Sequence, residues 1–176
     1  APPRSVLNSP ELALTPSWLV PAIKHVFNRD ITCDARASRT NHIVDSFITT
    51  EDSFDTFDLY LGRLGQAPYF FPPCGVNELS EHADKVLCDV RSDRFPSDRC
   101  AFLAIPVSCF DIPCTLSKLN WPTLMQHFRG MFEHFPHIVE TSVEKAVIFR
   151  DVFVHDPLAP DMCVVQLVPE ATHVWG

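Results

Sequence analysis

The sequence predicts a single α+β domain in which a mixed β-sheet of about four to five strands is covered by about three to four helices. Apolar side chains at helical spacing alternate along the chain with β-branched and aromatic runs. Apolar residues make up 46% of the 176 residues, which is typical of a globular core. No internal repeat or Gly/Ser-rich linker divides the chain, so residues 12–176 are expected to form one unit after an N-terminal arm at 1–11.

The segment after Ser17 predicts the first helix, because its apolar side chains share one helical face. These residues are Leu19, Val20, Ile23, Val26 and Phe27. Pro21 requires this helix to begin late or to bend. A short strand is expected at 43–49, where β-branched and aromatic residues gather.

A second helix is expected to begin at Thr50, a good N-cap, and to end before Gly65. Residues 66–75 contain three prolines around three aromatic residues, which predicts an irregular but ordered loop. The stretch 77–90 is ambiguous. Its first part fits a helix, whereas 86–90 also fits a strand.

The continuous apolar run at 100–107 predicts a buried strand. Residues 120–135 predict a long amphipathic helix that begins at Asn120 and ends at Pro136. The β-branched runs at 143–154 and 162–168 predict two neighbouring strands joined by a wide turn.

Composition excludes several function classes. The net charge is −8, with 14 basic and 22 acidic residues and no basic run, which disfavours nonspecific nucleic-acid binding. No apolar run is long enough to span a bilayer. Only five Gly are present and none lies in a phosphate-binding pattern, so dinucleotide and Walker-type sites are excluded and no cofactor is predicted.

The seven cysteines have irregular spacing, with no Cys-x-x-Cys pair, and are expected to be reduced thiols. A cytoplasmic or nuclear location follows from this expectation. The chain begins at Ala1 rather than Met, which suggests a portion of a larger intracellular or viral protein.

The leading functional prediction is a non-enzymatic protein-interaction or regulatory domain. The segment 68–73 holds Tyr69, Phe70 and Phe71 between prolines, and Trp175 lies near the end of the chain. Aromatic residues beside proline often form a docking surface for a protein partner. The alternative interpretation is that these rings cover one edge of the core.

A hydrolase is the alternative function. In one version Cys109, which follows the predicted buried strand, is the thiolate nucleophile, and His134, His137 or His155 is the imidazole that takes up its proton. In the other, a metal ion is held by side chains around the end of the 143–154 strand: Asp151, His155, Asp156 and Asp161. Strand alternation would put Asp151 and His155 on one face, but the neighbouring prolines equally fit ordinary turns.

Overall fold

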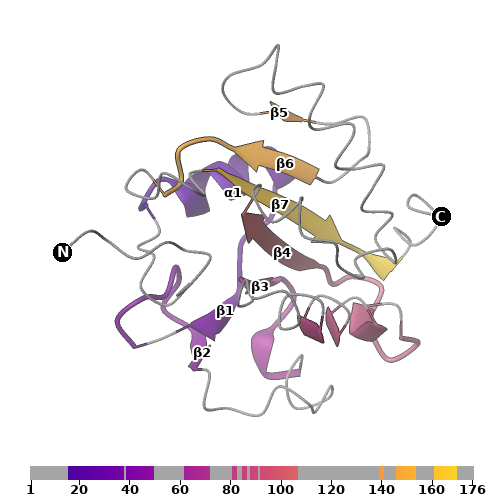
Figure 1. The fold of residues 1–176 in the computed structure, drawn as a ribbon. Coiled ribbons are helices and arrows are strands. Elements are labelled where there is room, and N and C mark those ends of the chain that lie inside the picture. The colour runs from indigo at the N-terminus through magenta and orange to yellow at the C-terminus, as the bar shows by residue number, and fades with distance from the viewer. Residues whose placement is uncertain are drawn as a thin grey trace.

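The computed structural model describes residues 16–37, 39–49, 62–71, 81–82, 85–86, 88–90, 92–106, 139–140, 146–153 and 161–169. Its elements are α1 (Leu19–Phe27), β1 (Cys33–Ala37), β2 (Phe47–Thr49), β3 (Pro68–Phe70), β4 (Ala101–Pro106), β5 (Val139–Glu140), β6 (Ala146–Phe149) and β7 (Met162–Leu167) (Figure 1). The strands form one seven-stranded sheet, in the order β2-β1-β3-β4-β7-β6-β5. This mixed sheet with helices agrees with the α+β class, but the predicted number of four to five strands is wrong.

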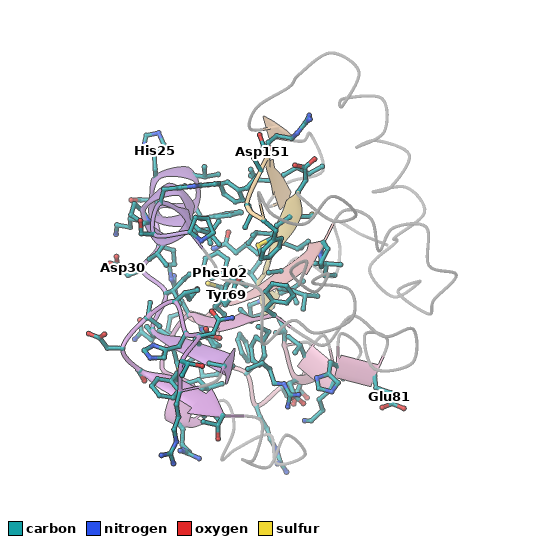
Figure 2. All side chains as sticks on the ribbon, turned by 60° about the vertical axis from the view of Figure 1, so that its left-hand side comes forward. His25, Asp30, Tyr69, Glu81, Phe102 and Asp151 are labelled. Atoms are coloured by element: carbon teal, nitrogen blue, oxygen red, sulfur yellow. The ribbon has the colours of Figure 1, made fainter. Side chains whose placement is uncertain are left out.

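The sheet consists of two halves that meet at β4. Strands β1, β2, β3 and β4 run parallel to one another. From β4 onward the pairing is antiparallel, through β7 and β6 to β5. Figure 2 shows α1 on one side of the sheet and the helical residues of 81–90 on the other. Both faces are therefore covered, as expected for inner parallel strands.

Helix α1 is found where the sequence predicts it. Leu19 and Ile23, four residues apart, are fully buried against the sheet. Pro21 is the third residue of the helix. At this position a backbone N–H would have no acceptor within the helix, so proline costs no hydrogen bond there. The helix ends at Asn28, whose φ of 53° is left-handed, a common way to end a helix.

Strand β1 is a strand that the sequence pattern did not predict. Its sequence, Cys-Asp-Ala-Arg-Ala, contains no β-branched residue and has two charged ones. Strand β2 is shorter than the predicted 43–49, because residues 43–46 belong to the connection that leads back from β1. We call residues 39–46 the β1–β2 connection.

The prediction of an irregular loop at 66–75 is wrong at its centre. Pro68–Phe70 form β3, an inner strand between β1 and β4 in which all three residues are buried. Proline is accommodated because it is the first residue of the strand. Upstream, residues 62–64 are helical and Gly65 follows with a φ of 78°, which agrees with the predicted helix end; residues 50–61 lie outside the described part.

The remaining predictions are mostly confirmed where the structure describes them. β4 is a strand with all six residues buried, and β6 and β7 are antiparallel neighbours. The ambiguity at 77–90 is resolved, because the described residues between 81 and 90 are helical. The helix predicted at 120–135 lies outside the described residues. None of the described helices has the length and apolar character needed to cross a membrane.

Candidate functional site

The candidate site lies where the connections of the parallel half change direction. From β1 the chain moves to β2 on one side, then returns past β1 to form β3 on the other side. The connections that leave the carboxyl ends of β1 and β3 therefore diverge. In open sheets with parallel strands, ligands bind at this kind of switch point, outside the carboxyl ends of the strands.

A β-bulge in β1 directs its two charged side chains to opposite faces of the sheet. Asp34 pairs with Phe47 and Ala37 pairs with Thr49, so β1 advances three residues while β2 advances two. Asp34 also pairs with Tyr69 and shares the α1 face of the sheet with that residue. After the bulge, Ala37 returns to this face, which leaves Arg36 on the opposite one.

Arg36 and His82 form the polar part of this edge on the face away from α1. Both side chains are half-buried. Burial, and secondarily the positive charge of Arg36, lowers the pKa of His82 to about 4. The imidazole is therefore uncharged at neutral pH, while the guanidinium remains a cation. Glu81, the neighbour of His82, is exposed and points away from the sheet (Figure 2).

On the α1 face, Phe71 follows β3 directly and is half-buried. Its ring lies 5.7 Å from that of Phe153, in a tilted arrangement. Phe71 also packs against the hydrophobic core on this face. An aromatic ring thus flanks the carboxyl end of β3 on one face of the sheet, and the Arg36 and His82 pair lies on the other.

Asp34 is the buried carboxyl group of β1, only 4% exposed. Its Oδ2 accepts a hydrogen bond from the Ile43 N–H at 3.1 Å. Its Oδ1 is buried and has no hydrogen-bond partner among the described residues. Burial raises the pKa of Asp34 to about 6, against smaller lowering effects from hydrogen bonds and from His42.

His42 is fixed beside Asp34 by two contacts. Its Nδ1 donates to the Val44 carbonyl oxygen at 2.8 Å, and its ring stacks on Phe47 with centroids 4.1 Å apart. Because a carbonyl oxygen can only accept, the Nδ1 that contacts Val44 carries a hydrogen.

Perturbed ionisable groups gather around β1. Among the described residues, the pKa is shifted at Cys33, Asp34, His82, Asp89 and Cys163. The first two belong to β1, and the third is affected by Arg36 of β1. Such clusters are more frequent at functional sites than elsewhere. No group of three or more potential metal ligands occurs in the described part of the chain.

The predicted partner-binding residues are only partly at the surface. Tyr69 and Phe70 are each 1% exposed, and the Tyr69 hydroxyl donates to the Met162 sulfur at 3.6 Å. The prediction that these two rings form a docking surface is therefore wrong, and the core-cover interpretation applies to them. Phe71 alone reaches the edge of the sheet, and Trp175 lies outside the described residues.

The predicted metal site is contradicted in one respect. β6 ends at Phe149 and residues 150–153 form a turn, so strand alternation cannot put Asp151 and His155 on one face. Asp151 has a φ of 58°, and its N–H donates to Asp161 Oδ1 at 2.9 Å. The other carboxylate oxygen of Asp161 lies 3.1 Å from Nε of Arg150. These contacts agree with the turn interpretation.

The remaining predicted catalytic and metal-binding residues lie outside the described part: Cys109, His134, His155 and Asp156. Sequence reasoning missed Asp34, Arg36 and His82. The available signal was the pair of charged residues within the short segment 33–37, next to the apolar Ile31. In comparisons with protein families, curated proteins and solved structures, nothing matched the chain.

Proposed function

We propose that this chain is a non-enzymatic recognition domain that binds a small anionic ligand carrying an aromatic group at the carboxyl ends of β1 and β3. The observation that carries the proposal is the position of Arg36 and His82 beside the switch point between these strands. The proposal keeps the predicted binding role but moves it from Tyr69 and Phe70 to this edge.

The chemistry of the edge favours an anion. Arg36 supplies a permanent cation whose planar guanidinium can bind two oxygens of a carboxylate or phosphate. His82 is neutral because of burial and the adjacent guanidinium, so it supplies a hydrogen bond without a second charge. Phe71 offers an aromatic surface on the other side of the edge. A cation, a neutral hydrogen-bonding group and an aromatic ring are sufficient to bind such a ligand without catalysis.

The proposal is tested by measuring the thermal stability of the chain with phenyl phosphate, inorganic phosphate and phenol at constant ionic strength. A ligand that binds the folded state raises the melting temperature by mass action. We expect phenyl phosphate to stabilise more than either fragment, and Arg36→Gln to remove this stabilisation. Arg94→Gln is the matched control, because Arg94 is an exposed arginine in the segment that leads into the amino end of β4, whereas Arg36 lies near the carboxyl end of β1.

Two results would contradict the proposal. One is a folded Arg36→Gln variant that retains the full response to phenyl phosphate. The other is an equal loss in Arg94→Gln, which would indicate a general charge effect instead of a site.

A thiol hydrolase remains a second candidate, because β4 ends at the same edge of the sheet. Cys109 follows Pro106, the last residue of β4, by three positions in the sequence. This connection supports a test of Cys109 with p-nitrophenyl acetate as the substrate. Hydrolysis that is lost in Cys109→Ala but retained in Cys88→Ala, a variant of an exposed cysteine, would favour the enzyme over the recognition domain.

A further inference from the structure

Asp34 is a buried carboxyl group that the proposed ligand site does not use. Its side chain lies on the α1 face of β1, whereas Arg36 lies on the opposite face. A carboxylate that is 4% exposed is unfavourable unless cations or hydrogen-bond donors compensate for the lost water. The surroundings of Asp34 therefore determine whether this group stays charged.

Asp34 holds the β1–β2 connection against the strand at two points. The Ile43 N–H donates to the side chain at Oδ2, at 3.1 Å. The Asp34 N–H donates to the carbonyl oxygen of Ser46 at 2.9 Å. The backbone N–H of Arg36 also stabilises the carboxylate. None of these hydrogen bonds satisfies the other carboxyl oxygen, Oδ1, which has no hydrogen-bond partner among the described residues.

Each element around Asp34 presents few ionisable groups to it. The connection presents His42, β3 presents the neighbouring Tyr69, and β1 itself contributes Cys33. β2 presents Phe47, which does not ionise. Among these groups His42 alone favours the charged carboxylate, and its effect is smaller than that of burial.

We propose that the Asp34 carboxyl group is a proton-sensitive latch that keeps the β1–β2 connection closed when neutral and lets it open more often when ionised. The ionised form leaves a charged, unpartnered Oδ1 under the connection, and opening brings water to that oxygen. Uptake of one proton from solvent neutralises the carboxyl group. Opening then no longer has the free-energy advantage of hydrating a buried charge. The proposal does not depend on the ligand site.

The pKa values give the direction and the size of the effect. The carboxyl has a pKa of about 6 when buried, and 3.8 is its ordinary value when the connection is open. The closed form is therefore favoured most below pH 3.8, loses that advantage as the pH rises to about 6, and changes no further above it. Between pH 5 and 7 the opening equilibrium should shift by about tenfold.

The experiment is hydrogen–deuterium exchange of the folded chain at pH 5 and pH 7, corrected for the intrinsic exchange rates. We expect peptides from 39–46 to lose about tenfold in protection at the higher pH, while peptides from β4 change much less. In Asp34→Asn the protection of 39–46 should be independent of pH. His42→Gln should retain the pH dependence, since burial and not the imidazole is its main cause.

Several outcomes would overturn the latch. Equal protection of 39–46 at the two pH values would do so, as would an equal change in β4, which would indicate global unfolding. Loss of the pH dependence in His42→Gln would identify the imidazole as the switch. If the variants misfold, NMR titration of the Asp34 carboxyl resonance in wild type provides an independent test. A midpoint below pH 4.5 contradicts the proposal, and a midpoint near 6 supports it.

Discussion

The two halves of the sheet differ in how they use burial. In the antiparallel half, β4 is buried at every residue and β7 is buried at all but Gln166, and both strands are predominantly apolar. In the parallel half, β1 buries Asp34, which is 4% exposed, and partly buries Arg36. Apolar burial favours folding, whereas the burial of a carboxylate opposes it. The antiparallel half therefore contributes mainly apolar burial, whereas the parallel half also carries polar groups whose burial costs stability.

The largest expected effect tests the antiparallel half as the source of stability. Phe149 in β6 is fully buried in the core against α1, so Phe149→Ala should lower the free energy of unfolding by roughly 3–5 kcal/mol. Phe47 in β2 is half-buried, and Phe47→Ala should cost less, about 1–2 kcal/mol. Urea unfolding measures both. Equal losses would remove the distinction between the halves.

The second prediction tests the cost of the buried carboxyl in the parallel half. Asp34→Asn should raise the free energy of unfolding by about 1–3 kcal/mol at pH 7. The sign follows from the raised pKa: wild type is most favoured below pH 3.8, where the carboxyl is neutral, and loses stability up to about pH 6. The advantage of the variant should therefore disappear in unfolding experiments near pH 3.5. A variant less stable than wild type at pH 7 would mean that the charged form is compensated.

The third prediction concerns the turn that leads into β3. Gly65 has a φ of 78°, and a Cβ there would lie 3.0 Å from side-chain atoms of Thr32. Gly65→Ala should lower the free energy of unfolding by about 1–2 kcal/mol, because alanine is strained at a positive φ and its Cβ would be too close to Thr32. Gly62→Ala is the control: its Cβ would meet nothing within 4 Å, and the change should be neutral or stabilising by up to about 1 kcal/mol. Thermal melts distinguish the two, and a neutral Gly65→Ala would show that the turn relaxes.

The smallest expected effect is at the surface. Lys24 and Asp30 form an ion pair of 3.0 Å in which the side chains are 47% and 80% exposed. Lys24→Met should change the free energy of unfolding by less than about 0.5 kcal/mol, since solvent screens such pairs. A larger loss of unfolding free energy that diminishes in 1 M salt would show that surface ion pairs also contribute substantially to stability.

The sequence predicted elements where one local signal dominated. Helix α1 and strands β4 and β7 have strong apolar patterns, and the structure confirms them. Asp161 lies beside a turn, as Pro160 indicated, and accepts a hydrogen bond from the Asp151 N–H, although Asp151 itself was expected in a strand. These are cases in which nearby residues alone determine the structure.

The parts that sequence reasoning missed depend on contacts distant in the chain. Strand β1 forms because β2 and β3 provide hydrogen bonds on both sides, although its own sequence has little β-propensity. Pro68 suggested a loop, but as the first residue of β3 it is compatible with an inner strand. The candidate site depends on strand order, and no local pattern encodes the return of the chain past β1.

The lengths of the outermost strands bear on how the protein behaves at high concentration. β2 and β5 lie at the two ends of the described sheet and have only three and two residues. A sheet grows by the addition of foreign strands when its border offers a long row of unpaired amides and carbonyls. Such short borders offer few of these groups, so intermolecular strand pairing gains little free energy there. The long, almost fully apolar β4 and β7, which would be the most aggregation-prone segments if exposed, are each paired on both sides.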